Sequence, residues 1–276
     1  MKPASSAQGL AERRRVVVRD GAAADPEPDV VTVEEPLEIR IDDEPVAVVM
    51  RTPGDDFDLV AGFLLTEAIL PEPAALGTLS YCPSASPPNE RNVVDVRLAE
   101  GVPFDGAGIK RNFYATSSCG VCGKASIDQV RLQARRDLAD FEVAGATLHG
   151  LPDRLRTAQD QFERTGSLHA AGLFDPAGEL LALREDVGRH NAVDKLVGHH
   201  VAAGRWPPPA AILMVSGRTS FEIVQKARLA GIGFIASVSG PSSLAVDLAL
   251  EAGVTLTGFV RGRGFNVYAN PGRLRL

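Results

Sequence analysis

The sequence predicts an α/β protein in which a smaller N-terminal α+β domain precedes a larger α/β domain. The first half carries short strand-like runs around a single helical stretch, without a regular alternation of strands and helices. The second half alternates short apolar runs with helical stretches roughly every 20 residues, which is typical of a parallel sheet covered by helices. The change from one pattern to the other predicts that the chain is divided into these two domains.

Composition limits the possible functions. The chain has 276 residues, of which 45% are hydrophobic and 23% are charged, so it is long enough to bury a core. A net charge of −6 argues against a broad nucleic-acid-binding face. Three cysteines are too few for a disulfide scaffold, and no run reads as a signal peptide or a membrane span. We therefore expect a cytoplasmic protein that binds neither nucleic acid nor membrane.

We expect four segments along the chain. Residues 1–28 are rich in Pro, Ala, Ser and charge, which predicts a disordered tail. Residues 29–116 form the predicted small α+β domain, and residues 117–124 form a mobile loop that carries two thiols. Residues 125–276 form the predicted α/β domain, which we expect to bind a cofactor.

In the small domain, strand-like runs at 29–41 and 44–51 flank an Asp-Asp turn. A helix is predicted within 52–70, where an acidic first turn precedes apolar residues at helical spacing. These apolar residues are Leu59, Val60, Phe63 and Leu64. Pro71 and Pro73 should stop this helix, and a polar loop then leads to another strand.

In the large domain, residues 167–186 predict a hairpin with a Pro-Ala-Gly turn. A helix should follow, because five residues recur at helical spacing and would form one face of it. That face consists of Val193, Leu196, Val197, His200 and Val201. The apolar run at 210–217 then predicts a strand buried on both faces. The elements expected after it are a helix at 219–231, a strand at 232–240, a helix at 241–253 and a strand at 254–262.

Two loops that follow these strands are rich in small polar residues. The loop at 215–220 contains Ser216 and Arg218, and the loop at 237–243 contains Ser239. Open α/β sheets bind ligands at the carboxyl ends of their strands. Hydroxyls, backbone N–H groups and a guanidinium could hold a phosphate there, or the loops could simply cap two helices.

The stretch "LREDVGRHNAVDK" at 183–195 crowds polar side chains into a junction between a strand and a helix. These side chains are Glu185, Asp186, Arg189, His190, Asn191, Asp194 and Lys195. Such groups cost stability unless they are paired, so the sequence predicts either a salt-bridge network or a ligand-binding cluster. His169, on the preceding hairpin, is by itself typical of a buried histidine with satisfied hydrogen bonds.

Glycine and arginine alternate near the C-terminus. The segment consists of Phe259, Val260, Arg261, Gly262, Arg263 and Gly264. Exposed glycine backbone and guanidinium forks suit contact with a polyanion. A polar hairpin would show the same pattern, so both interpretations stay open.

Cys119 and Cys122 form a C-x-x-C pair in "SSCGVCGKAS". Electron transfer, zinc binding and nucleophilic sulfur chemistry are the three possibilities. The Trp and Pro of thioredoxin-like sites are missing, and so is a second ligand pair for structural zinc. A thiolate near Lys124 and the start of a predicted helix would be stabilised, which favours carriage of sulfur as a persulfide. Cys82 lies in a Pro-Ser loop and is expected to be an exposed bystander.

Several of these stretches together resemble the FdhD/NarQ family, the accessory sulfurtransferases of formate dehydrogenase. The matching stretches are "EEPLEIRIDDEPVAVVMRTPGDDFDLVAGFLLTE", "TSSCGVCGKASI", "FDPAGELLALREDVGRHNAVDKLVG", "SGRTSFEIVQKA" and "SSLAVDLALEAGVTLTGFVRG". The resemblance extends from about residue 32 to the C-terminus.

The resemblance implies a cytidine-deaminase-like α/β/α fold for the C-terminal domain and a homodimer. It also implies a sulfurtransferase in which Cys119 is the persulfide cysteine and Cys122 is its partner. A cysteine desulfurase would supply the sulfur, and the protein would deliver it to the molybdenum of bis-molybdopterin guanine dinucleotide, for use by formate dehydrogenase. Residues 259–264 match the family's cofactor-binding segment, and the two serine-rich loops become candidates for the guanine nucleotide ends.

Other functions remain possible at this level. Deaminase chemistry is not expected, because the chain has neither H-x-E nor P-C-x-x-C, and no metal site is expected. One alternative is a non-catalytic chaperone that only carries the molybdenum cofactor. Another is a dithiol redox or zinc module.

Overall fold

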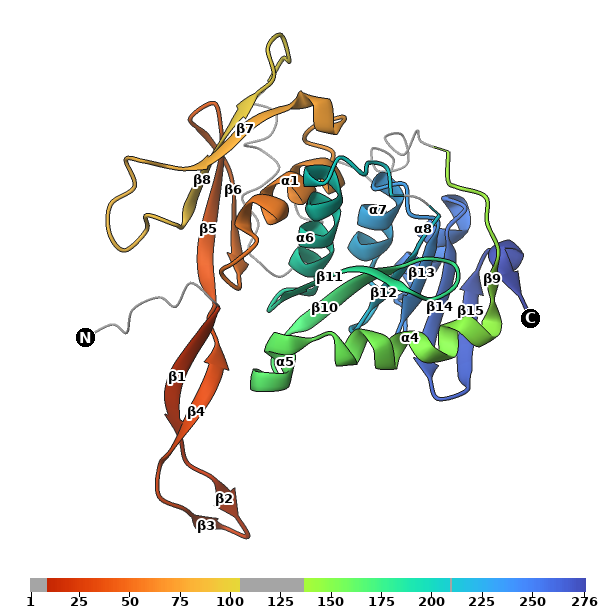
Figure 1. The fold of residues 1–276 in the computed structure, drawn as a ribbon, viewed down its shortest axis with the longest axis horizontal. Helices are drawn as coiled ribbons and strands as arrows, with labels where there is room; N and C mark the ends of the chain where they lie inside the picture. The colour runs from red at the N-terminus through yellow and green to blue at the C-terminus, as the bar shows by residue number, and fades with distance from the viewer. Residues whose placement is uncertain (1–8, 105–136, 209) are drawn as a thin grey trace.

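The structure is a computed structural model and describes residues 9–104, 137–208 and 210–276. Two units pack against each other, and a ribbon of strands near the N-terminus stands away from them (Figure 1). The smaller unit holds a four-stranded sheet and the larger unit a six-stranded sheet.

The small unit consists of this sheet and one helix packed on it. Its strands lie in the order β6-β5-β8-β7. The elements are β5 (Glu35–Ile41), β6 (Glu44–Arg51), α1 (Asp56–Thr66), the 3-10 turn η1 (Pro73–Ala75), β7 (Leu76–Tyr81) and β8 (Val93–Leu98). Leu37, Ile39 and Ile41 alternate along β5 into a core shared with α1, as the two-residue period of a strand requires. The predicted hairpin and helix are confirmed, although the helix ends before the two prolines.

The large unit is built on a mixed sheet with the strand order β11-β10-β12-β13-β14-β15. The strands are β10 (His169–Phe174), β11 (Leu180–Asp186), β12 (Ile212–Val215), β13 (Phe234–Ser237), β14 (Thr255–Arg261) and β15 (Gly264–Ala269). β12, β13 and β14 are parallel, whereas β10 and β15 run antiparallel to their neighbours. The predicted hairpin at 167–186 and the predicted parallel layer are therefore confirmed.

Helices cover both faces of this sheet. The helices are α4 (Gly145–Thr157), the short α5 (Asp160–Thr165), α6 (Arg189–Ala202), α7 (Phe221–Leu229) and α8 (Ser243–Glu251). Along β12, Leu213 and Val215 join the core under α6, α7 and α8, while Ile212 and Met214 join the core under α4. The sequence did not predict α4, whose apolar face is only three leucines and whose interior contains Pro152. No helix among the described residues is long and apolar enough to cross a membrane.

The C-terminus returns to the start of α4. After the 3-10 turn η2 (Pro271–Arg273), strand β16 (Leu274–Arg275) pairs in parallel with β9 (Val143–Ala144). Asn270, just before this turn, donates hydrogen bonds from its side-chain amide to the carbonyls of Ala249 (2.6 Å) and Val254 (3.0 Å). This end of the chain is thereby fixed to both faces of the sheet.

Helices α1 and α6 join the two units through direct contact of their backbones. A Cβ placed on Gly62 of α1 would lie 1.8 Å from the carbonyl oxygen of Asp194 on α6. A Cβ placed on Gly198 of α6 would likewise lie 1.8 Å from the carbonyl oxygen of Asp58 on α1. Real Cβ atoms never come so close to a backbone oxygen. Only glycine at both positions permits this crossing.

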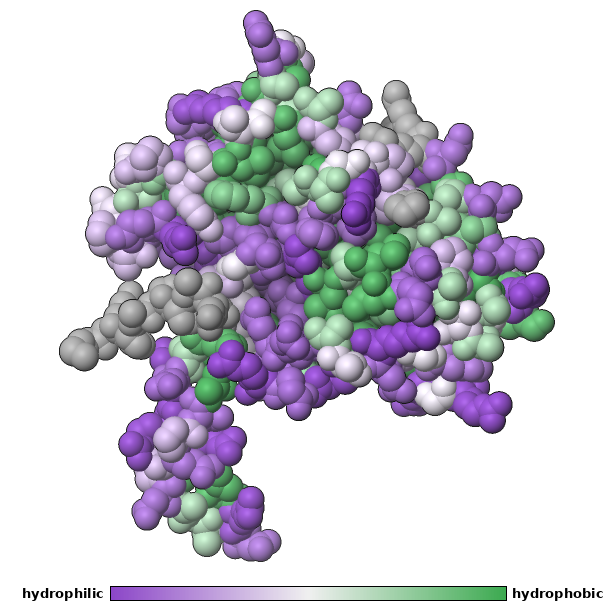
Figure 2. Space-filling view, in the orientation of Figure 1, coloured by the Kyte–Doolittle hydropathy of each residue, from purple (hydrophilic) through white to green (hydrophobic). Residues whose placement is uncertain are grey.

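The N-terminal ribbon corrects the prediction of a disordered tail at residues 1–28 for its described part, and residues 1–8 lie outside the described residues. Strand β1 (Leu10–Arg15) pairs with β4 (Glu27–Thr32), and β2 (Val18–Arg19) pairs with β3 (Ala22–Ala23) at the tip. The ribbon surface is mostly hydrophilic in Figure 2, which is why composition suggested disorder. Arg15 crosses between the strands to Glu27 at 2.8 Å and to Asp29 at 3.5 Å. Cross-strand pairs of this kind stabilise a ribbon without a large apolar face.

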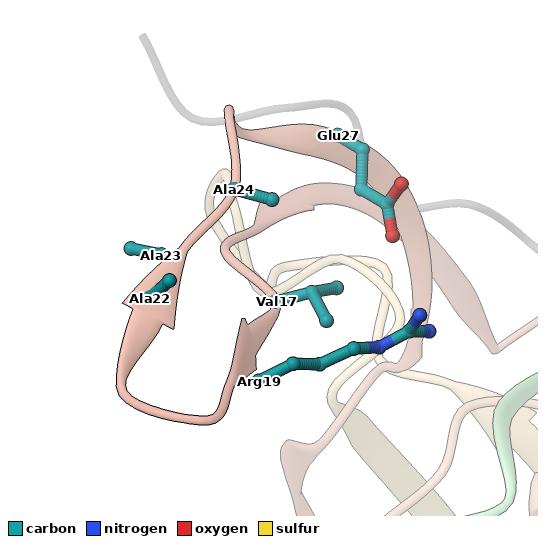
Figure 3. Close-up of a pocket in the computed structure, with 6 residues that line it drawn as sticks. All are labelled: Val17, Arg19, Ala22, Ala23, Ala24 and Glu27. Carbon is teal, nitrogen blue, oxygen red and sulfur yellow. The ribbon is translucent and has the colours of Figure 1, made fainter.

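A hollow of about 380 Å³ lies at the tip of the ribbon (Figure 3). Its lining residues are Val17, Arg19, Ala22, Ala23, Ala24 and Glu27. Small apolar side chains form most of this lining, and its two charged residues have opposite signs. All of its lining residues belong to the N-terminal ribbon, which stands away from both sheets (Figure 1).

We expect Gly62→Ala and Gly198→Ala each to lower the free energy of unfolding by about 3 kcal/mol, because the added methyl collides with backbone that cannot retreat. Urea unfolding followed by circular dichroism measures this loss. Gly150→Ala is the matched control, because its Cβ in α4 would meet nothing closer than 3.9 Å. That control should gain up to about 1 kcal/mol from helix propensity. A Gly62→Ala protein as stable as the wild type would contradict the close crossing.

Candidate functional site

The candidate site lies at the edge where several strands of the large sheet end. Strands β11, β12, β13 and β14 point the same way, because β10 is antiparallel to both β11 and β12. Helices α6, α7 and α8 follow β11, β12 and β13 directly in the chain, so all three helices begin at this edge. The free N–H groups and positive dipole ends of these helices favour a negatively charged ligand.

The loops that follow β12 and β13 are tied to each other. The N–H of Thr219 donates to the carbonyl of Gly240 (3.3 Å), and the N–H of Ser242 donates to the carbonyl of Thr219 (3.0 Å). The hydroxyl of Ser242 accepts the N–H of Ala245 (3.3 Å) and caps α8. Ser220 makes no such bond at the start of α7. Helix capping therefore accounts for only one of the two predicted loops.

The three residues predicted in these loops differ in their roles. The hydroxyl of Ser216 accepts the N–H of Ala170 (2.9 Å), which fixes the loop to β10. Ser239 offers its carbonyl oxygen to the hydroxyl of Ser237 (2.6 Å). Arg218 makes no hydrogen bond or ion pair with the described residues.

Arginines gather at this edge without acidic partners. Four of them pair with no carboxylate among the described residues, and these are Arg189, Arg218, Arg261 and Arg263. The Nε of Arg189 is buried and has no hydrogen-bond partner. Elsewhere in the chain, Arg51 and Arg184 are held by aspartates at 3.0 and 2.8 Å. Glu222, in the first turn of α7, interacts electrostatically with Arg189 but forms no ion pair with it, so these arginines leave the edge with an excess of positive charge.

His169 opens β10 and lies beside two of these arginines. A Cβ on Gly217 would lie 3.3 Å from Nδ1 of His169 and 3.9 Å from Cδ of Arg189, so both side chains meet at the end of β12. Burial and the charge of Arg189 lower the pKa of His169; Asp186 opposes this shift and Arg218 adds to it. The imidazole is therefore neutral at neutral pH.

His190 lies at the junction of α6 and α7. Its Nε2 is 3.1 Å from the hydroxyl of Ser220 and 3.7 Å from a carboxylate oxygen of Glu222. Burial, together with the charges of Lys226 and Arg189, lowers the pKa of His190 to about 4. Its neutral ring joins the starts of two helices by hydrogen bonding.

The glycine–arginine segment carries β14 past the edge. Phe259 has a left-handed backbone (φ 52°), and its N–H donates to the carbonyl of Ser239 (3.2 Å). Its ring lies over Gly240, where an added Cβ would come within 2.8 Å of Cζ. The guanidinium carbon of Arg261 lies 5.7 Å from the centre of the same ring. Phe259 therefore supports both the neighbouring loop and an arginine.

The rest of this segment forms a hairpin with β15. Gly262 turns with φ 56°, and Arg261 and Arg263 on either side of it are exposed. Val260 is fully buried in the core under α4, so only its backbone can face a ligand. The predicted polar hairpin is confirmed, and it leaves both guanidiniums available to an anion.

The stretch at 183–195 contributes to two buried networks, and the first of them joins the two units. Asp186 and Lys195 form a buried ion pair (2.8 Å), and Asp186 also accepts the N–H of Thr52 (3.1 Å) from the small unit. Lys195 donates to the carbonyl of Thr52 (2.8 Å). The side-chain amide of Asn191 donates to Asp186 (2.9 Å) and to the carbonyl of Met50 (2.7 Å). These contacts occupy both amide hydrogens of Asn191, which we predicted to bind a cofactor, and they give it a place in the network that joins the units.

A second buried network connects α1, α6 and α7. Lys226 lies 2.9 Å from Asp194 and 2.7 Å from Glu67, and the hydroxyl of Thr66 donates to Asp194 at 2.6 Å. Burial alone would lower the pKa of Lys226, but its two carboxylate neighbours raise it overall, so the ammonium stays charged. The sequence offered one signal for this site, a lysine within the otherwise apolar helical face of "FEIVQKA".

Cys119 and Cys122 lie outside the described residues, as do the predicted loop at 117–124 and the helix predicted after it. Cys82 is described, and it corrects the expectation of an exposed bystander. It is 7% exposed, with its Sγ 3.3 Å from the hydroxyl of Ser84 and 3.9 Å from a guanidinium nitrogen of Arg40. In the described ranges, no three His, Cys, Asp or Glu side chains gather as metal ligands would.

These features define a mixed α/β protein whose sheet edge gathers helix N-termini and arginines that pair with no described carboxylate. Residues 32–275 match the model of the FdhD/NarQ family. The chain belongs to this family.

Named relatives agree with this assignment, and a solved structure shares the fold. The chain is 54% identical over 273 residues to the sulfur carrier protein FdhD of Streptomyces avermitilis, covering 97% of this chain and 96% of that protein. It is 49% identical over 284 residues to the protein of the same name from Anaeromyxobacter sp. (strain K), covering 100% and 97%. A crystal structure from Desulfotalea psychrophila, described as a formate dehydrogenase accessory protein, has the same fold. That similarity has a TM-score of 0.75 at 24% identity and covers 96% of this chain and 99% of the other.

We expect His190 to make the protein sensitive to acid. Between the ordinary histidine pKa of 6.5 and about 4, the unfolded chain binds a proton that the native state does not bind. Native stability should therefore fall as the pH falls through this window, by at most about 1.4 kcal/mol per pH unit for one histidine. His190→Gln should flatten the slope in urea unfolding measured from about pH 7 to about pH 5. His149→Gln on α4 is the control, and an unchanged slope in His190→Gln would contradict this origin.

Proposed function

We propose that this chain is a sulfur carrier that serves the maturation of formate dehydrogenase. Cys119 accepts a sulfur atom as a persulfide from a cysteine desulfurase, and the protein delivers it to the molybdenum of bis-molybdopterin guanine dinucleotide bound at the sheet edge. Family membership and the names of the relatives support the sulfur-carrier role. The proposal that the protein binds this cofactor rests on the arginine-rich edge of the large sheet, where three helices begin.

The sulfur chemistry follows from the C-x-x-C pair. The Cys119 thiolate attacks the outer sulfur of the desulfurase persulfide, so the bond between the two sulfurs breaks there and a new one forms on Cys119. We assign to Cys122 the attack on Sγ of Cys119, which closes a disulfide and releases the outer sulfur as hydrosulfide. The two electrons that reduce this sulfur come from the dithiol, and a cellular dithiol such as a thioredoxin-class protein then restores it.

The sheet edge fits the phosphate-bearing part of the proposed substrate. Its arginines supply charge-assisted hydrogen bonds, and helix N-termini supply oriented N–H groups. The carboxylate of Asp186 is held by Lys195 and forms no ion pair with an arginine among the described residues. Each guanine nucleotide arm of the cofactor carries a diphosphate, which is the type of charge that such an edge favours.

Persulfide loading tests the sulfur-carrier step. We expect the wild-type chain, incubated with a cysteine desulfurase and cysteine, to gain one sulfur atom on Cys119 by mass spectrometry. Cys119→Ala should gain none, whereas Cys122→Ala should load sulfur but fail to release it as sulfide. Cys82→Ala is the matched control and should behave as wild type. Undiminished loading in Cys119→Ala would overturn the assignment. A Cys119→Ala variant that still yields active formate dehydrogenase would favour a non-catalytic cofactor chaperone.

Guanine nucleotide binding tests the cofactor step. We expect Arg261→Ala and Arg263→Ala each to weaken GDP binding about tenfold in isothermal titration, because each removes a charged donor from the exposed hairpin. Arg275→Ala, another exposed arginine near the C-terminus, should leave the affinity unchanged. Equal GDP affinity in wild type and both hairpin variants would place the nucleotide elsewhere.

A further inference from the structure

We infer that the sheet edge holds a second phosphate subsite, formed by Arg189, Arg218 and His169 around the end of β12. This inference rests on the proposed function, in which the ligand is a phosphate-bearing nucleotide cofactor. The subsite is separate from the hairpin at 259–264, and it takes one phosphate or diphosphate group of the same ligand.

Strand order separates the two groups of arginines. His169 begins β10, Arg218 follows β12, and the hairpin at 259–264 continues β14. Strands β10 and β14 are three strand spacings apart, or about 14 Å. Arg218, after β12, is two strand spacings from β14, or about 10 Å, and an extended nucleotide can place one phosphate at each position.

The end of β12 brings the proposed phosphate-binding groups together. Gly217 has no side chain, and the space that a Cβ would fill is bordered by the ring of His169 and the stem of Arg189. Helix α6 begins at Arg189, and its N-cap residue, Gly188, offers no side-chain cap to the first N–H groups. Backbone donors, an imidazole and two guanidiniums therefore converge where β12 ends.

Two polar atoms here lack partners within the described part of the chain. The Nε of Arg189 is buried without a hydrogen bond, and so is the hydroxyl of Thr219, a residue with no exposed surface. Burying a polar group unpaired costs free energy, and a ligand that binds the partly exposed Arg189 would offset part of that cost at this edge. Two carboxylates lie near these groups. Asp186 is already held by Lys195 and Asn191, and Glu222, which acts electrostatically on Arg189, lies 3.7 Å from Nε2 of His190.

His169 responds to the charge of whatever binds beside it. The charged groups that act on it are Asp186 from β11, Arg189 from α6 and Arg218 from the loop after β12. With burial and both arginines acting, its pKa lies below the ordinary value, so the free protein holds it neutral. A phosphate dianion between the arginines reverses this balance and favours the imidazolium. Ligand binding at this subsite therefore takes up a proton.

Titration of the full-length protein with pyrophosphate and with GDP tests the subsite. We expect Arg189→Gln and Arg218→Gln each to weaken both ligands about tenfold. Arg164→Gln, at an exposed arginine on α5, is the matched control and should change neither. Pyrophosphate binding should persist in Arg261→Ala, because the second subsite remains. Circular dichroism melts confirm that each variant is folded.

The outcomes separate this inference from the function on which it rests. A wild-type protein that binds neither GDP nor pyrophosphate overturns the proposed cofactor binding and this subsite with it. Normal GDP binding that is unchanged in Arg189→Gln and Arg218→Gln overturns the subsite alone. Weaker GDP binding with unchanged pyrophosphate binding also overturns it, because the arginines then do not contact phosphate.

Proton uptake provides a second readout, which loss of a purely structural residue would not alter. Titrations near neutral pH in two buffers of different ionisation enthalpy give the number of protons bound with the ligand. Wild type should take up a measurable fraction of a proton with pyrophosphate. His169→Gln should take up none, and His149→Gln should match the wild type. Equal uptake in wild type and His169→Gln would show that His169 does not sense the ligand.

Discussion

The crossing of α1 and α6 is the constraint on which the other contacts between the units depend. Two glycines bring the helix backbones so close that the polar groups beside them fall within bonding distance of the opposite unit. Arg184 of β11 reaches Asp58 of α1 at 2.8 Å, and Lys226 of α7 reaches Glu67, the residue after α1, at 2.7 Å. Buried charges are tolerated only with such partners. A wider crossing would leave these charges in the interior unpaired.

The polar stretch at 183–195 shows how one segment serves both stability and chemistry. Its acids are used inside the protein: Asp186 and Asp194 bind lysines, and Glu185 accepts the N–H groups of Gln161 and Phe162 at the start of α5. Of its two arginines, Arg184 pairs with Asp58, whereas Arg189 forms no ion pair in the described part of the chain. Internal use of the carboxylates therefore leaves the sheet edge electropositive, although the chain as a whole is acidic.

The sequence predicted those elements that a regular hydrophobic period defines. The alternating strand β5, the buried strand β12 and the helical face of α6 all follow from spacing alone. Helix α4 was not predicted because its apolar face is narrow. The ribbon was predicted to be disordered because the charged residues that pair across its strands give it the composition of a disordered segment. At the site, arginine and glycine were visible as motifs. Neither the contact between His169 and Gly217 nor the use of Asn191 between the units could be predicted, because both depend on strand order and on packing between distant segments.

Thr52 gives the contact between the units a meaning beyond stability. Its N–H binds Asp186, and its hydroxyl accepts the N–H of Val187 at 3.1 Å. The backbone that leads into Arg189 is thus held in place by the end of a strand from the other unit. The larger unit does not complete its own binding edge, and part of the scaffold behind that edge is supplied by the smaller sheet. The two sheets are separate units, but both contribute to the ligand-binding edge. A substitution in the small unit can therefore alter the affinity for the ligand without contacting the ligand.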